Sequence, residues 1–401
     1  MPRGRAGSGS AQYVVGVDVG STAVKCHVYD RAAAVRGSGC AKVESLYPRP
    51  GWVELDPEAL WSQFVGVIKE AVQAYMEVLG KLIQATLKVA GNKFLYLNQR
   101  KAVLLQLFEA AGLHMRQVAA LGISTQRSTF ITWHKRTGKP FHNFISWQDL
   151  RSAELVNSWN RSLLLKANEA AKENNCCFGT VDTWLLYRLT KGSVFATDYS
   201  NASSTGVFEP FTKCWNPTLC NLLSIPMSIY PPVKDTSFNF GSSDSEIFGV
   251  PIPIMALISA NDPYLCASFM GLKPTTTRNH LVRAILESVA FRNKQLFDII
   301  VKKVRIPLHT VRADGGVSNN GFVMQMTSDL INKKIEKPSN TDMSSLGAAF
   351  LAGLASGLWT DKEQLKKLRQ VETVFEPQKD MEEYKAAMDT WMQAVKCSLH
   401  W

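Results

Sequence analysis

The stretch Asp18-Val-Gly-Ser-Thr-Ala-Val-Lys25 follows a β-branched run at 13–17 and leads into an alternating segment at 24–29. This pattern predicts a β-hairpin with a tight turn at Gly20. The turn's backbone N–H groups and the hydroxyls of Ser21 and Thr22 can face one anionic group, and Lys25 adds positive charge. Asp18 is a candidate magnesium ligand beside phosphates. A plain structural hairpin explains the turn equally well, since the Walker pattern is missing.

A second glycine turn, Asp314-Gly315-Gly316-Val-Ser-Asn319-Asn320, lies between a predicted strand at 310–313 and a predicted helix at 321–331. Paired glycines at such a junction let a phosphorylated ligand approach the backbone closely. A plain loop is again an equal alternative for this turn alone. Two such turns about one domain apart favour a nucleotide held in a cleft between two domains, as in the actin, Hsp70 and sugar-kinase superfold.

The length and composition indicate a large globular protein. The 401 residues are 46% hydrophobic and 20% charged, which suits two domains and excludes disorder, collagen and coiled coil. No apolar run reaches the roughly 20 residues of a membrane helix. Residues 1–11 are expected to be a flexible basic tail and not a secretory signal. Helical and strand patterns interleave, with helices expected at 57–75, 180–189 and 280–301, so the fold class is α/β.

The net charge and the cysteine spacing bear on the ligand class and on the cellular compartment. Of the net charge of +11, about half is spread along the chain, which suits an enzyme for anionic substrates as well as it suits a nucleic-acid binder. Without a strong basic cluster, no nucleic-acid partner is expected. The eight cysteines show no CxxC pair and no zinc spacing, which indicates reduced thiols and a cytoplasmic protein.

Several ordered motifs resemble the FGGY carbohydrate kinases, in the glycerol kinase branch. The resemblance implies a two-domain actin-like ATPase (ribonuclease H-like) fold, with an N-terminal substrate and phosphate domain at 12–258 and a C-terminal nucleotide domain at 262–401. It also implies that the chain uses ATP and Mg²⁺. The matching stretches are Gly16–Lys25, Gly51–Pro57, Gly122–Arg127, Ile145–Asp149, Phe178–Leu185, Thr197–Ser203, Asp314–Asn320 and Ser345–Ala349.

The resemblance also assigns roles to residues. It places the turn 18–25 near the ATP phosphates and magnesium, and the turn 315–320 against the nucleotide. Gln126 and Arg127 would lie in the substrate site, where the guanidinium of Arg127 donates to adjacent polyol hydroxyls. Trp147 either walls that pocket or packs in the core. Asp182 is expected to support the core, and the tract 197–203 to be hydrogen-bonded scaffolding.

The chain departs from the family pattern in its substrate loop and at one seam. Ser128 stands where glycerol kinases carry Glu, and Ala260 stands where the family has its general-base Asp. From Asn261 the chain resembles a much later family segment, so the second domain is expected to be incomplete at its start. A shorter seam is expected near 166–167. Asp262 is a doubtful substitute for the missing base.

A third departure is the extra stretch 76–106, which is expected to form two short helices at best. It is either a membrane-surface or partner-binding segment, or a tolerated insertion. The expected function is ATP-dependent phosphorylation of glycerol or a similar polyol to sn-glycerol 3-phosphate. The alternative is a catalytically impaired isoform that binds a ligand or partner. A homo-oligomer and a low stability are also expected.

Overall fold

The chain divides into two compact units. The first unit comprises Met1–Pro263 and Ser344–Lys366, and the second comprises Tyr264–Met343 and Lys367–Trp401. The computed structural model describes residues 13–89, 115–151, 170–171, 173–222, 225–260, 271–304, 307–340, 342–368 and 370–398. The second unit therefore differs from the predicted domain at 262–401, because residues 344–366 pack with the first unit.

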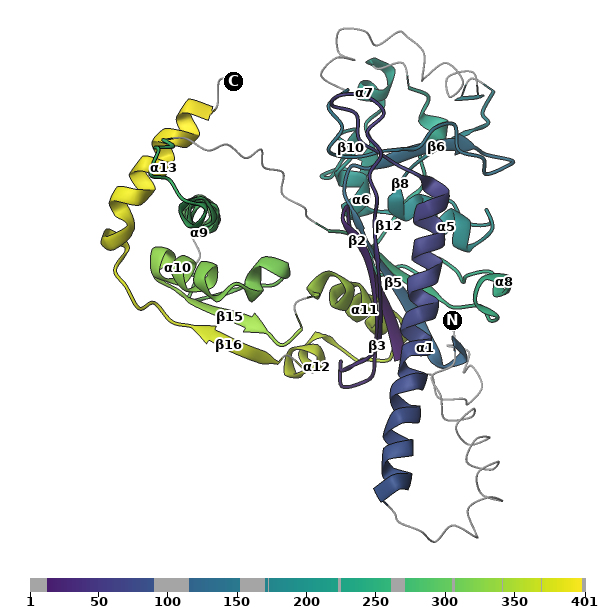
Figure 1. The fold of residues 1–401 in the computed structure, drawn as a ribbon. Coiled ribbons are helices and arrows are strands. Elements are labelled where there is room, and N and C mark those ends of the chain that lie inside the picture. Colours follow the sequence, from purple (N-terminus) through teal and green to yellow (C-terminus); the bar gives the residue numbers. More distant parts are fainter. Residues whose placement is uncertain are drawn as a thin grey trace. The chain divides into compact units, whose positions relative to one another are not determined.

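A five-stranded sheet forms the centre of the first unit (Figure 1). Strands β1 (Tyr13–Val19), β2 (Ala23–Tyr29) and β3 (Val35–Lys42) are antiparallel neighbours. Strands β5 (Val118–Gln126) and β13 (Ile254–Ala260) add in parallel, in the order β13-β5-β1-β2-β3. The predicted hairpin and the ribonuclease H-like fold class are confirmed by this pairing.

Helix α1 (Pro57–Val89) covers one face of this sheet. It approaches so closely that a Cβ on Gly39 would lie 2.4 Å from the Val67 carbonyl oxygen. The predicted helix at 57–75 is correct, but it continues through 76–89 as one helix instead of ending before the extra stretch.

Helix α11 (Met343–Ser356) covers the opposite face of the sheet. The ladder pairs Gly16 with His27 and His27 with Ser38, so Gly16 and Gly39 lie on opposite faces, because successive side chains of a strand point to opposite faces. A Cβ on Gly16 would lie 2.0 Å from the Ser345 carbonyl oxygen, and one on Gly122 would lie 2.1 Å from the Ala348 carbonyl oxygen. The Ser345 hydroxyl also hydrogen-bonds His27 and Tyr29 of β2. The sheet is thus the middle layer of an α/β/α sandwich.

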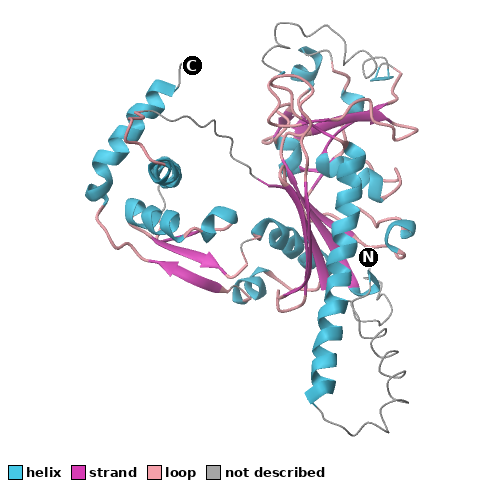
Figure 2. Cartoon of the chain, in the orientation of Figure 1, coloured by secondary structure: helices cyan, strands magenta, loops and turns pink. Residues whose placement is uncertain are grey.

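A four-stranded sheet, β4-β7-β6-β8, adjoins this layer in the first unit, and Figure 2 shows its strands in magenta. Its members are β4 (Glu54–Leu55), β6 (Phe130–His134), β7 (Phe144–Ile145) and β8 (Cys176–Thr180), followed by α5 (Val181–Leu189). Smaller elements are η1 (Met115–Gln117), β9 (Thr197–Asp198), α6 (Tyr199–Ser203), β10 (Phe208–Glu209), β11 (Cys214–Trp215), α7 (Pro217–Leu222), η2 (Met227–Ile229), β12 (Val233–Lys234), α8 (Ser245–Phe248) and α12 (Lys362–Lys367).

The described part of the second unit has one three-stranded sheet, β14-β15-β16. Helix α10 (Gly321–Ile331) has the predicted bounds, and the expected helix at 280–301 lies within α9 (Arg278–Val304). Several apolar side chains of α9 remain about half exposed, among them Ile285 at 50% and Ile299 at 55%. The elements are α9 (Arg278–Val304), β14 (Thr310–Arg312), η3 (Gly316–Asn319), α10 (Gly321–Ile331), β15 (Lys334–Pro338), β16 (Val371–Phe375), η4 (Met381–Tyr384) and α13 (Lys385–Ser398).

Some predictions fall outside the described residues. These are the tail at 1–11, the part of the extra stretch beyond Val89, the seam near 166–167, and the proposed substitute base Asp262. Among the helices that the structure does describe, none is long and apolar enough to cross a bilayer.

Candidate active site

Three parallel strands end at the same edge of the main sheet. The register pairs Asp18 with Ser124 between β1 and β5, and Gln126 with Ala260 between β5 and β13. The carboxyl ends of parallel strands are where open α/β sheets bind their ligands. This edge therefore collects the first glycine turn, the predicted substrate loop and Ala260, the position at which the resemblance predicts a general base.

The first glycine turn joins β1 to β2. The Gly20 N–H donates to the Ala23 carbonyl over 3.0 Å, and the Thr22 carbonyl accepts from Val43 N–H over 2.9 Å. Ser21 is half-buried and Thr22 is exposed, while Asp18 and Lys25 face each other in the ladder. The turn is thus a fixed hairpin end that places Ser21 and Thr22 at the sheet edge.

The substrate loop follows β5. Gln126 is buried, and neither atom of its side-chain amide has a hydrogen-bond partner among the described residues. Arg127 is half-buried and makes no hydrogen bond or ion pair with them either. An orphaned buried amide beside an available guanidinium suits a hydroxyl-rich ligand, because buried polar groups are otherwise paired.

Ser128 holds this loop in place. Its φ is +59°, in the left-handed region. Its N–H donates to the Ser204 hydroxyl oxygen over 3.3 Å, and its own hydroxyl donates to the Ser204 carbonyl over 2.9 Å. Ser128, where the resemblance predicts Glu, is therefore engaged in a contact between two loops.

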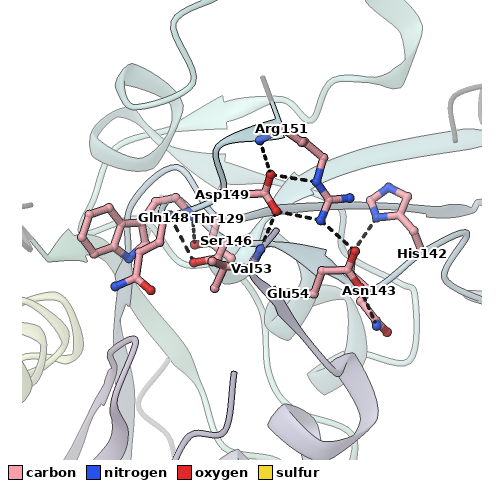
Figure 3. A network of polar contacts seen from close by, with 10 residues as sticks. Val53, Glu54, Thr129, His142, Asn143, Ser146, Gln148, Asp149 and Arg151 are labelled. Atoms are coloured by element: carbon pink, nitrogen blue, oxygen red, sulfur yellow. Dashed lines mark hydrogen bonds and ion pairs between the residues drawn. The ribbon is translucent and has the colours of Figure 1, made fainter. Parts of the chain in front are cut away.

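Trp147 lies in the turn after β7, between Ser146 and Gln148 of the polar network that Figure 3 shows. Its N–H donates to Thr129 Oγ1 over 3.1 Å, and its side chain is half-buried. The carboxylate of Asp149 accepts from Val53 N–H over 2.7 Å and from Arg151 N–H over 2.9 Å. These bonds fix the turn that carries the indole.

Arg151 completes the network. Its guanidinium donates to both Asp149 and Glu54 over 2.7 Å and lies 3.8 Å above the Trp52 ring. Burial opposes its charge, but the hydrogen bonds to these carboxylates prevail and raise the pKa of Arg151. Sequence reasoning assigned no role to Asp149 or Arg151, although Asp149 closes the matched stretch at 145–149.

Two buried carboxylates, those of Asp182 and Asp198, hydrogen-bond residues near the same sheet edge. Asp182 accepts from the Thr180 hydroxyl over 2.5 Å and from the Thr197 hydroxyl over 2.6 Å. Asp198 accepts from the Ser200 hydroxyl over 2.6 Å, and that hydroxyl oxygen accepts from Ser259 N–H of β13 over 2.9 Å. The scaffolding predicted for 197–203 is present in these bonds.

Burial and the nearby charge of Asp198 raise the pKa of Asp182 to about 7, against the two hydroxyl donors that lower it. The folded state then binds more protons than the unfolded state between pH 4 and 7, so stability should fall as pH rises through this window. Asp182→Asn should flatten that slope in thermal melts at pH 5 and pH 8. An unchanged slope would contradict a titrating Asp182.

The second glycine turn belongs to the second unit. Gly315 has a φ of +82°, and a Cβ on Gly315 or Gly316 would meet nothing within 4 Å. Asn320 caps α10 by accepting from Val323 N–H over 3.1 Å, and the Asn319 side chain accepts from Lys337 over 3.3 Å. An open glycine backbone before a helix start suits an anionic ligand.

A metal site built by the protein alone is not seen among the described residues, since no three His, Cys, Asp or Glu side chains gather there. Magnesium in phosphoryl-transfer sites usually takes one or two carboxylates together with substrate phosphates and water. Asp18, at the sheet edge beside the glycine turn, fits that requirement.

Comparison with known proteins identifies the family. The N-terminal domain model of the FGGY family of carbohydrate kinases matches residues 13–91, 92–172 and 163–263, and its C-terminal domain model matches 247–356. Glycerol kinase 5 of Gallus gallus is 62% identical over 553 residues, covering 100% of both chains. Glycerol kinase 5 of Homo sapiens is 43% identical, covering 97% of this chain and 96% of the relative.

Solved structures show the same fold. The glycerol kinase of Plasmodium falciparum with ADP has a TM-score of 0.73 at 22% identity, covering 99% of this chain and 100% of that one. Gluconate kinase from Lactobacillus acidophilus has a TM-score of 0.69 at 16% identity, covering 96% and 98%. With both domain models matched and these relatives aligned, the chain belongs to the FGGY family of carbohydrate kinases.

Proposed function

We propose that the chain transfers the γ-phosphoryl group of ATP to a primary hydroxyl of glycerol or a similar small polyol, giving sn-glycerol 3-phosphate and ADP. The observation that carries this proposal is the shared sheet edge, where the Gly20–Thr22 turn and the Gln126–Arg127 loop end neighbouring parallel strands. Adjacent strands lie about 4.8 Å apart, which brings a phosphate turn and a polyol loop within reach of one substrate pair.

Each group of residues has a proposed task. Ser21, Thr22 and Lys25 are the proposed ATP-phosphate ligands, and the turn at 315–320 is a proposed nucleotide-binding turn. Asp18 holds Mg²⁺, which offsets phosphate charge when bound. Gln126 and Arg127 bind the polyol, and Trp147 walls its pocket.

Ala260 favours a second candidate function, a catalytically impaired form that binds its ligands. Methyl cannot accept the proton that the attacking hydroxyl must lose. A missing general base typically lowers the rate by about 10²–10⁴-fold. The 553-residue alignment is longer than this 401-residue chain, which supports the proposal that an internal part of the family fold is absent here.

The test is glycerol-dependent ADP release by the purified chain. Arg127→Ala should abolish it, and Gln126→Met should abolish it while leaving the melting temperature equal or higher, because Met removes an unpaired buried amide. Activity that persists in both variants would belong to a contaminating host kinase. If the folded parent releases no ADP yet binds glycerol, the impaired form is the function; if it binds neither glycerol nor ADP, both proposals fail.

A further inference from the structure

A cavity of about 460 Å³ in the first unit is lined by four basic side chains, Arg136, Lys139, Arg188 and Lys191. It lies beyond the C-terminal end of β6, whereas Thr129 of the candidate active site precedes the start of that strand. Its walls come from the turn after β6, the C-terminal end of α5 and the first turn of α1. Nothing in the proposed phosphoryl transfer uses it.

Two of the four cations are available. Arg136 and Lys139 are exposed and make no ion pair with the described residues. Their turn is nevertheless fixed, because Gly138 N–H donates to the His134 carbonyl over 2.8 Å. Gly138 has a φ of +68°, and a Cβ there would lie 3.3 Å from the Tyr187 ring. The two charges are therefore presented from a preformed loop.

Arg188 is already oriented for bidentate recognition. Its guanidinium lies 4.8 Å from the Trp61 ring centre and 5.3 Å from that of Trp184. Both carboxylate oxygens of Glu58 accept from it, over 2.5 and 3.0 Å. The Glu58 side chain is 62% exposed, so this pair contributes little and a more highly charged anion can replace it.

Lys191 also forms ion pairs with carboxylates that an anionic ligand can replace. It pairs with Glu246 over 2.5 Å and with Asp244 over 3.3 Å, and the Glu246 side chain is 80% exposed. Arg188 and Lys191, which line the cavity, are thus paired with exposed carboxylates that an anionic ligand can displace.

We propose that this cavity binds the phosphate group of a small phosphorylated molecule. The Arg188 guanidinium donates two parallel hydrogen bonds to the phosphate in place of Glu58, and the other three cations surround the dianion. The cavity's volume falls in the range of ligand sites, so the organic part of the molecule fits beside its phosphate.

The experiment is calorimetric titration of the full chain with glucose 6-phosphate, with glucose as the uncharged control. Arg136→Ala/Lys139→Ala should weaken binding about tenfold or more, the loss expected when hydrogen bonds to charged groups are removed. The matched control is Lys42→Ala/Arg116→Ala, which removes two exposed cations of the same unit that do not line the cavity. It should leave the affinity within about twofold, because distant surface charges are screened by salt.

A third variant is expected to increase the affinity for glucose 6-phosphate. Glu58→Gln removes the competing carboxylate, while Asp56 still caps α1 by accepting from Glu58 N–H over 2.8 Å. Binding of glucose 6-phosphate should become tighter. Equal weakening in both double variants, no change in the cavity variant, or no binding by the parent would each overturn the proposal. None of these outcomes depends on kinase activity.

Discussion

Replacing Ala260 with aspartate is expected to raise the rate of glycerol-dependent ADP release by about 10²–10⁴-fold, the usual contribution of a general base. Ala260 pairs with Gln126 in the β13–β5 ladder, so position 260 lies on the strand next to the one that leads into the proposed polyol loop. The gain should appear mainly in kcat, because the base acts on the proton lost during attack and not on substrate binding.

Ala260→Asn is the matched control, since it has nearly the same shape but cannot accept the proton. It should leave the rate of the parent unchanged. Equal rates for the Asp and Asn variants would contradict the assignment of position 260, provided that both melt at the parent's temperature. An Ala260→Asp gain that disappears with Arg127→Ala would tie the chemistry to the proposed loop.

Gly122→Ala is expected to lower the free energy of unfolding by about 3 kcal/mol or more, at the upper end for overpacked cores. Its Cβ would lie 2.1 Å from the Ala348 carbonyl oxygen and 2.5 Å from the carbonyl carbon. These are backbone atoms, so helix α11 must move as a body to admit one methyl group. Gly16→Ala meets Ser345 O at 2.0 Å and should behave alike. Denaturant unfolding of the full chain measures both.

Gly347→Ala is the control on the same helix. A Cβ at Gly347 meets nothing within 4 Å, so the substitution should stabilise α11 by about 0.5–1 kcal/mol through helix propensity. If Gly122→Ala does not lower the free energy of unfolding below that of Gly347→Ala, α11 does not pack on this face of the sheet.

Local pattern predicted the elements that frame the site. The alternation at 24–29 and the glycine at position 20 specify the hairpin, because both depend on neighbouring residues alone. Helix α10 was predicted with its observed bounds, directly after the second glycine turn. The parallel pairing of β1 with β5 was not predicted, because residues 118–126 lie about 100 positions from β1 and no local pattern joins them.

Contacts between distant segments were not predictable in this way. No local pattern indicates that Ser345 lies against Gly16, because the small residues at 345–349 suit any close helix packing. The bonds between Ser128 and Ser204 join positions 76 residues apart, and Val53 reaches Asp149 across 96 residues. Such pairs are set by tertiary structure. The sequence therefore indicated only that Ser128 departs from the family's substrate loop, and not that it joins this loop to Ser204.

The placement of α11 also has a consequence for synthesis on the ribosome. Strands β1, β2 and β5 leave the ribosome long before residues 344–366, which complete the first unit but follow residues 264–343 of the second unit in the sequence. At typical elongation rates of about 5–20 residues per second, the glycine face of the sheet waits roughly 10–40 s for its helix. During that interval the nascent chain exposes a bare β surface, which is the kind of site that chaperones recognise.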